Sequence, residues 1–234
     1  MSENPKSTRR WLQFSLRGLL LLMAVAAVPL SWTANRTRQQ REDLAALEKL
    51  GCTVEYRPAF GPPSVLEQIR KLLGLENPRA VTCITADANG NLTEISDAEL
   101  VHLGWLTQLE LLNLNGTLVT DASLVDLQEL PRLRFLGLRR TQITDAGLSL
   151  LRGLVQLEWI SLGATQITDA GLVHLRGLNQ LQSLDLRGTQ VTDAGLVHIQ
   201  GMTQLHNLDL SLTQVTDAGV QELQRALPKV EIVH

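Results

Sequence analysis

The most regular chemistry-bearing side chains in this sequence are aspartates. They occur at positions 97, 121, 145, 169, 193 and 217, a constant step of 24 residues. A ladder of carboxylates could bind calcium, but the calcium-binding nonapeptide repeat has a different spacing. Each aspartate lies at the start of a predicted helix, as in Thr144-Asp145, where side-chain oxygens accept hydrogen bonds from the free N–H groups of the first turn. The ladder therefore predicts helix caps, each contributing about 1 kcal/mol, and no metal site.

Two cysteines and three histidines are the remaining candidates for metal or covalent chemistry. Cys52 and Cys83 fit no metal-ligand spacing, and both lie on apolar segments that we expect to be neighbouring strands. They are either two buried small side chains or, in an oxidising compartment, a disulfide. His102, His174 and His198 form one column on the predicted convex side, where helices diverge, so a shared zinc ion is not expected.

Motifs of catalysis are missing from the sequence. It contains no G-x-S-x-G, P-loop or H-E-x-x-H motif and no Cys–His pairing. The net charge of -3, from 21 Lys and Arg against 24 Asp and Glu, provides no polycationic surface. We therefore expect a protein with no enzymatic activity, no cofactor and no nucleic-acid partner.

An apolar segment near the N-terminus predicts a membrane helix. Residues 18–32 read GLLLLMAVAAVPLSW without a charge. Four basic residues precede this run: Lys6, Arg9, Arg10 and Arg17. A helix extended back to Trp11 is about 33 Å long, close to the roughly 30 Å of a hydrocarbon core, with Trp11 and Trp32 at the two interfaces. We expect a cytoplasmic basic tail over residues 1–10, a transmembrane helix or signal anchor over 11–33, and the rest on the exported side.

Signal-peptide cleavage is the competing interpretation of this segment. Ala24, Val25 and Ala26 form an A-x-A site after a basic region and a short apolar run. Cleavage after Ala26 would leave a secreted protein, so both interpretations export the remainder of the chain.

The residues between this segment and position 95 predict a stalk and a cap. Residues 34–51 carry leucines at 44, 47 and 50 and end at Gly51, as a helix does. Within residues 52–94, the patterns indicate a strand over 52–56, a helix over 65–73 and a strand over 80–85. We expect these to form one right-handed crossover unit that caps a parallel stack.

From residue 95 to residue 234 the chain repeats itself. The unit that begins at Thr168, TDAGLVHLRGLNQLQSLDLRGTQV, has leucines at 172, 175, 178, 181, 184 and 186. These offsets fit a coil that turns once per repeat, with a short strand around LQSLDL and a short helix around GLVHLRGL. Aromatic residues make up only 3% of the chain, as expected for a core of equivalent aliphatic layers.

These copies resemble the leucine-rich-repeat family, through QLQSLDLRGTQVTDAGL at 180–196 and the related LRFLGLRRTQITDAGL, LEWISLGATQITDAGL and LHNLDLSLTQVTDAGV. The resemblance implies an α/β solenoid with parallel strands on the concave face and short helices on the convex face. The TDAGL ending is similar to the cysteine-containing subtype of F-box substrate receptors. Threonine stands where that subtype has Cys or Asn, at Thr117, Thr141, Thr165, Thr189 and Thr213. An anchor followed by such repeats also resembles exported repeat proteins of planctomycete bacteria.

The residues between core leucines on each strand are expected to face out of the concave sheet in columns. The first column is Leu111, Phe135, Trp159, Ser183, Asn207; the second is Asn113, Gly137, Ser161, Asp185, Asp209; the third is Asn115, Arg139, Gly163, Arg187, Ser211. Three large apolar side chains next to arginines are typical of interface anchors. The alternative is that they pack against each other as cross-strand neighbours. A fourth column, Glu110, Arg134 and Glu158, predicts a solvated charge ladder of small energetic value.

We expect a membrane-anchored, non-catalytic module that binds an unknown protein. Its predicted partner-binding residues are Leu111, Phe135, Trp159, Arg139, Asp185, Arg187 and Asp209. A structural component of the cell envelope is the alternative. A substrate receptor like those of ubiquitin ligases is a further alternative, although no F-box precedes the repeats. At the C-terminal end, Val230 and Ile232 predict an apolar edge strand that could pair two copies into a homodimer.

Overall fold

The computed structural model describes residues 38–39, 42, 44–46, 48–49, 52–57, 80–85, 95–98, 100, 103 and 106–234. The predicted membrane segment, residues 11–33, and the helix expected at 65–73 lie outside these residues. Within them, no helix is both long and apolar enough to cross a membrane. The described residues of the expected stalk are helical, and Leu44 is buried against the core.

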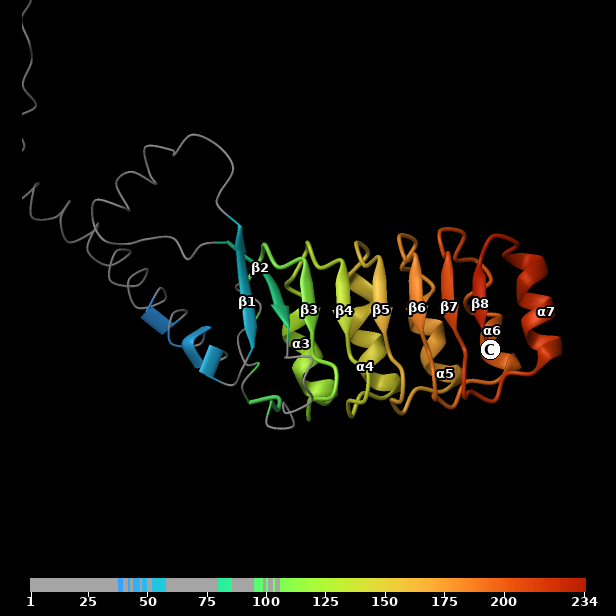
Figure 1. The fold of residues 1–234 in the computed structure, drawn as a ribbon, viewed down its shortest axis with the longest axis horizontal. Coiled ribbons are helices and arrows are strands. Elements are labelled where there is room, and N and C mark those ends of the chain that lie inside the picture. Colours follow the sequence, from blue (N-terminus) through green and yellow to red (C-terminus); the bar gives the residue numbers. More distant parts are fainter. Residues whose placement is uncertain are drawn as a thin grey trace, which may run out of the picture.

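The described part of the chain forms one curved, eight-stranded sheet whose strands follow the order of the sequence (Figure 1). The strands are β1 (Thr53–Arg57), β2 (Ala80–Thr85), β3 (Leu111–Asn113), β4 (Phe135–Gly137), β5 (Trp159–Ser161), β6 (Ser183–Asp185), β7 (Asn207–Asp209) and β8 (Glu231–Val233). All pairs from β2 to β8 are parallel. This confirms an α/β solenoid with parallel strands.

The pairing of β1 with β2 corrects one expectation. These two strands are antiparallel, with Val54 opposite Ile84. The right-handed crossover rule applies to parallel strands only, and the pattern of a strand, a helix and a strand does not fix the direction of the first strand. β1 therefore forms one edge of the sheet and runs in the direction opposite to all later strands.

From β3 onward, short helices return the chain from each strand to the next. They are η2 (Asp121–Ser123), α3 (Leu124–Leu127), α4 (Asp145–Leu150), η3 (Leu151–Gly153), α5 (Asp169–Leu172), η4 (Val173–Leu175), α6 (Asp193–Leu196) and α7 (Asp217–Ala226). Each of these returns begins after a threonine in extended conformation, and the hydroxyl of Thr144, for example, accepts a hydrogen bond from Ala146 N at 3.2 Å. Threonine is therefore the N-cap of the repeat.

The repeat aspartates have a different role from the predicted one. The carboxylate of Asp145 accepts hydrogen bonds from the backbone N–H (2.9 Å) and the hydroxyl (2.6 Å) of Thr168, which belongs to the next repeat. The same pair of bonds links Asp97, Asp121, Asp169 and Asp193 to a threonine 23 residues further on. The aspartate ladder thus ties neighbouring repeats together, and the prediction that these carboxylates cap their own helices is wrong.

The glycine of each TDAG sequence completes this arrangement. A Cβ added at Gly171 would overlap with Oδ1 of Asp145, and Gly147, Gly195 and Gly219 meet the aspartate of the preceding repeat in the same way. Glycine is therefore required at this position by the space that the carboxylate occupies.

The core consists of stacked aliphatic layers between the sheet and the helices. Leu136, Leu138 and Leu148 are fully buried, as are their counterparts in the neighbouring repeats. The repeat threonines lie at the edge of this core, where each hydroxyl donates to a backbone carbonyl three residues earlier, as Thr141 Oγ1 does to Leu138 O at 2.6 Å. Each of these hydroxyls thus bridges the turn that follows its strand.

Candidate protein-binding face

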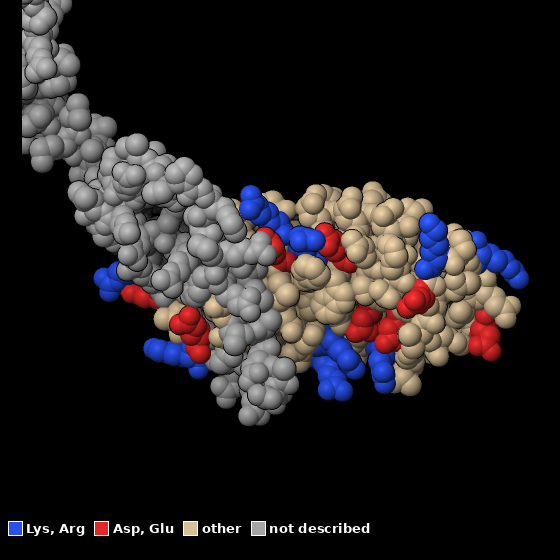
Figure 2. Space-filling model, turned by 45° about the horizontal axis from the view of Figure 1, so that its top comes forward, with Lys and Arg blue, Asp and Glu red and all other residues tan. Residues whose placement is uncertain are grey.

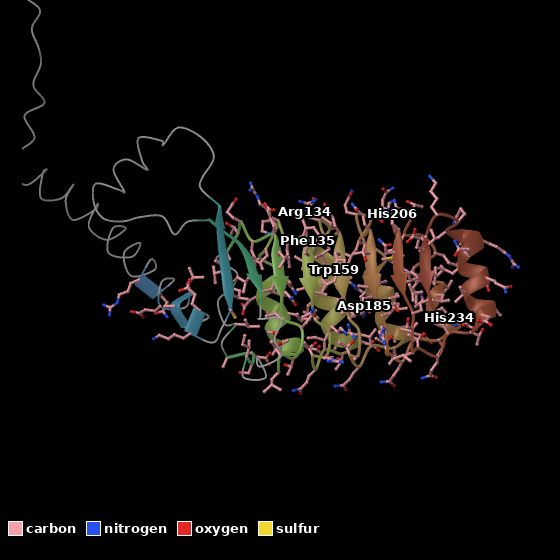
Figure 3. The ribbon with its side chains drawn as sticks, in the orientation of Figure 1. Arg134, Phe135, Trp159, Asp185, His206 and His234 are labelled. Carbon is pink, nitrogen blue, oxygen red and sulfur yellow. The ribbon has the colours of Figure 1, made fainter. Side chains whose placement is uncertain are left out.

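The concave columns lie in the register that the sequence predicts. Leu111 is opposite Phe135, and Phe135 is opposite Trp159, on the adjacent strands β3, β4 and β5. All three side chains are partly exposed, in contrast to the fully buried Leu112 and Ile160 beside them. These three side chains form the apolar strip, of which Figure 3 labels Phe135 and Trp159. The same column goes on beyond the strip with the polar residues Ser183 on β6 and Asn207 on β7.

An ion pair borders the apolar strip at the start of the strands. Arg134 donates to both carboxylate oxygens of Glu158, at 2.8 and 2.7 Å, and its guanidinium lies 5.4 Å from the centre of the Phe135 ring. The hydrogen bond to Glu158 is the largest cause that raises the pKa of Arg134. The side chains are 43% and 24% exposed, so this contact is a half-buried, bidentate pair. The predicted charge ladder is present at these two residues as an ion pair that is partly exposed to solvent.

A shallow depression of about 320 Å³ lies beside this ion pair. Its lining residues are Glu110, Pro131, Arg132, Arg134 and Gln156. Arg132 is fixed by a hydrogen bond of 2.6 Å to Gln108 Oε1. The depression is open and polar, and it adjoins the apolar strip at Arg134.

Asparagines and a glycine shape the N-terminal half of the second and third columns. Asn113 Oδ1 accepts from Asn115 N at 3.1 Å, and Asn115 Oδ1 accepts from Arg139 N at 2.7 Å. A Cβ at Gly137 would lie 2.6 Å from Asn113 Oδ1, so the amide side chains occupy the space above this glycine. These residues are therefore explained by the turns that end the strands.

The predicted acidic residues Asp185 and Asp209 make the same kind of turn. Asp185 Oδ1 accepts from Arg187 N at 2.9 Å, and Asp209 Oδ1 accepts from Ser211 N at 2.8 Å. Asp185 also receives the Ser161 hydroxyl at 2.6 Å. Both carboxylates remain partly exposed on the concave face, where they are neighbours in register.

The predicted arginines lie in the third column, at the carboxyl ends of the strands. Arg187 is exposed and Arg139 is partly buried, and neither forms an ion pair with another residue of the described ranges. The Nε atom of Arg139 is buried without a hydrogen-bond partner among those residues. The structure thus places all seven predicted residues on one face, with the apolar strip on β3 to β5 and the charges next to it. Figure 2 shows charged side chains of both signs around a largely uncharged surface.

The histidines and cysteines of the described ranges show no metal-binding arrangement. Each of two histidines accepts a hydrogen bond at Nδ1 from an arginine of the preceding repeat: His174 from Arg152, and His198 from Arg176. Burial, followed by the charge of Arg152, lowers the pKa of His174. Within the described residues, no group of three potential metal ligands lies close together.

Cys52 has a free, buried thiol, and burial raises its pKa. The backbone partner of Cys83 on the neighbouring strand is Glu55, three residues away from Cys52. At about 3.4 Å per residue, this offset exceeds the usual Cα–Cα distance of about 4.4–6.8 Å for a disulfide. The register therefore favours a buried small side chain over a disulfide at Cys52.

Sequence reasoning missed one exposed residue at a special backbone position. Leu212 adopts φ = 61° and is 75% exposed. Gly116 and Gly188 occupy the same position in other repeats with φ of 75° and 66°. Arg140 and Ala164 occupy it in the remaining two, also with positive φ. The available signal was a large apolar residue at a position that glycine fills in two repeats.

Sequence models of leucine-rich repeats match this chain in two places. A model described as leucine rich repeat matches residues 131–191, and a second of the same description matches residues 202–223. No curated protein matches the chain. The chain therefore carries leucine-rich repeats, as the resemblance in sequence implied.

Three of the solved structures to which this chain is similar come from bacteria. A leucine-rich-repeat protein of Leptospira interrogans is 24% identical with a TM-score of 0.51, over 66% of this chain and 37% of that protein. The chain thus spans little more than a third of that protein's length. Two internalins of Listeria monocytogenes, F and C2, are 26% and 21% identical, each with a TM-score of 0.42, and the matches cover 65% of this chain and 51% and 81% of theirs. A leucine-rich-repeat fold suggests a protein-interaction module, and such proteins are generally non-catalytic.

Proposed function

We propose that this chain is a non-catalytic binding module that engages a protein partner through the concave face of its solenoid. One observation carries the proposal. Phe135 and Trp159 lie side by side on β4 and β5 and remain partly exposed, whereas the other apolar residues of these strands are buried. Partly exposed aromatic side chains with an arginine over one ring are typical of the anchors of protein interfaces.

The repeat itself does not require these aromatics. The same register position holds Ser183 on β6 and Asn207 on β7, and the core beneath remains closed, with Leu184 and Leu208 buried. The fold therefore tolerates small polar side chains at this position. Cross-strand packing alone leaves the choice of the largest apolar side chain unexplained.

A pull-down from membranes of the source cells tests this proposal with the full chain as bait. We expect the Phe135→Ser and Trp159→Ser double variant to lose partners that the wild type retains, because Ser183 shows that serine is compatible with the fold. The matched control is Val155→Ser, which alters an apolar side chain that is 49% exposed in the loop after η3. Retention of the same partners by the double variant would contradict the proposal and leave a structural envelope component as the better interpretation.

The location of the module is part of the same proposal. The basic tail 1–10 and the apolar segment 11–33 support a single-pass anchor with the stalk 34–51, the cap 52–94 and the repeats 95–234 on the exported side, and cleavage after Ala26 would secrete them. The TDAGL ending supports the cysteine-containing-like subtype, and the order of anchor and repeats supports a relation to exported planctomycete proteins. A substrate receptor of ubiquitin-ligase type has no support beyond the repeat subtype.

A further inference from the structure

We infer that the concave face binds a partner segment that combines an apolar anchor with cationic side chains. The carboxylates of Asp185, Asp209 and Glu231 bind the cationic side chains in this inference. This inference rests on the proposed function, because it assigns chemistry to the partner of the same face. The apolar strip receives the anchor on β3 to β5, and the three carboxylates on β6 to β8 form the acidic half of the face. Figure 2 shows acidic side chains in the right half of the visible surface, with basic side chains beside them.

The negative charges of Asp185 and Asp209 are not needed by the turns in which these residues lie. Asn113 makes the equivalent turn on β3 with a neutral amide, whose Oδ1 accepts the backbone N–H two residues later at 3.1 Å. Asp185 and Asp209 make this bond at 2.9 and 2.8 Å. Two carboxylates directly opposite each other on neighbouring strands disfavour the folded state, since like charges repel. Asparagine would serve the turn of Asp209 equally well, so the charge of Asp209 is available for another purpose. Asp185 also accepts the Ser161 hydroxyl with its second oxygen, at 2.6 Å, and shares its partly exposed charge between this bond and the face.

No cation of the described residues neutralises the acidic half. Asp185, Asp209 and Glu231 have no lysine or arginine of those residues within ion-pair distance. In the apolar half, by contrast, the carboxylate of Glu158 is fully engaged by Arg134. Among the described residues of β3 to β8, the concave face therefore presents carboxylates without an ion-pair partner beyond the apolar strip, in the direction of the C-terminal strands.

The spacing of the strands gives the geometry of the matching segment. Neighbouring strands are about 4.8 Å apart, so Glu231, which is in register with Trp159, lies three strands or about 14 Å from it. Asp209 lies two strands away and two residues further along its strand, which is about 12 Å from Trp159 in all. An extended chain advances about 3.3 Å per residue. A partner that crosses the strands is thus expected to carry lysine or arginine about four residues after its apolar anchor.

Two families of labelled peptides test this inference against the full chain by fluorescence anisotropy. The first carries a Leu-Trp anchor followed by lysines at the spacing given above, and the second has glutamate at each lysine. We expect the lysine peptide to bind at least about tenfold more tightly at low salt, and the difference to vanish near 1 M salt, where the Debye length is about 3 Å.

Charge-only variants locate the effect. Asp185→Asn with Asp209→Asn keeps the turn-forming oxygens and is expected to weaken the lysine peptide about tenfold, as for two exposed ion pairs together. Glu129→Gln with Glu222→Gln removes the same charge from exposed positions on the helical side and is expected to leave binding unchanged.

Three results would overturn the inference: no binding of the lysine peptide, equal or tighter binding of the glutamate peptide through Arg139 and Arg187, or an asparagine variant that binds the lysine peptide like the wild type. The proposed function is judged separately, because the loss of membrane partners by the Phe135 and Trp159 serine variant does not depend on the sign of the peptide charge.

Discussion

A single methyl group added at Gly195 is expected to loosen the contact between two repeats. Gly195 lies in α6, where an ordinary glycine-to-alanine substitution stabilises a helix by about 0.5–1 kcal/mol. Here the added Cβ would overlap with Oδ1 of Asp169 and lie 3.0 Å from its Cγ. Because Asp169 belongs to the preceding repeat, the methyl group and the carboxylate cannot both keep their positions.

The magnitude follows from the bonds that the carboxylate would lose. Asp169 accepts from Thr192 N at 2.8 Å and from Thr192 Oγ1 at 2.7 Å. Hydrogen bonds to a charged group contribute about 1.5–3 kcal/mol each, and these are partly exposed, so we take about 3 kcal/mol for both. Subtracting the intrinsic gain of alanine leaves a net loss of about 2 kcal/mol in the free energy of unfolding for Gly195→Ala.

Urea unfolding of a double-mutant cycle measures this coupling. In the Asp169→Ala background the obstacle is removed, so Gly195→Ala is expected to keep only its intrinsic gain of about 0.5–1 kcal/mol, which is a coupling of about 3 kcal/mol between the two positions. Gly177→Ala is the control, because a Cβ there meets nothing within 4 Å. A destabilisation of Gly195→Ala that is equal in both backgrounds would refute the steric coupling between repeats.

Three further predictions concern charge, protonation and backbone strain. Hydrogen bonds from the backbone and side chain of Thr216 lower the pKa of Asp193. The stability that these bonds contribute is therefore present above the unfolded pKa of about 3.9 and is lost as the pH falls through the lower folded value. Asp193→Asn is expected to flatten this acid dependence in thermal melts. The pKa of His174 is also lowered, so protonation disfavours the folded state, and stability declines as the pH falls through about 6.5 and below; His174→Gln is expected to remove this step, and an unchanged pH profile would contradict it. Leu212→Gly is expected to raise the free energy of unfolding by about 0.5–1 kcal/mol, because leucine is strained at φ = 61° and buries little surface, and a fall in the urea midpoint would oppose this reasoning.

The register of the solenoid could be predicted from the sequence because every repeat has the same length. A constant period of 24 residues places Phe135 opposite Trp159 as soon as one strand is located, and the structure has this pairing. The direction of β1 could not be predicted in this way, since it precedes the repeats and shares no period with them. The pairing of Arg134 with both oxygens of Glu158 also needed coordinates, because opposite charges in a column do not reveal whether their side chains meet.

The role of the aspartates shows how a repeated polar residue should be interpreted. A residue that recurs in every repeat can serve its own helix or the next repeat, and the local pattern of Thr-Asp before a helix favoured the first. The structure shows the second, because the carboxylate of Asp145 reaches Thr168 and fills the space that Gly171 leaves. Threonine, aspartate and glycine of the TDAG sequence thus form one contact between repeats.

Regularity of this kind also separates the structural from the functional residues. Leucine, threonine, aspartate and glycine recur because each repeat must fit the next. Their side chains pack and form hydrogen bonds within the solenoid. A position whose residue changes from repeat to repeat is under no such constraint, and the change from Phe135 and Trp159 to Ser183 is the largest of this kind on the concave sheet. The carboxylates of Asp185 and Asp209 stand where Asn113 suffices on β3. Both departures lie on the same face, and this is why an apolar anchor and a cation are expected in one partner.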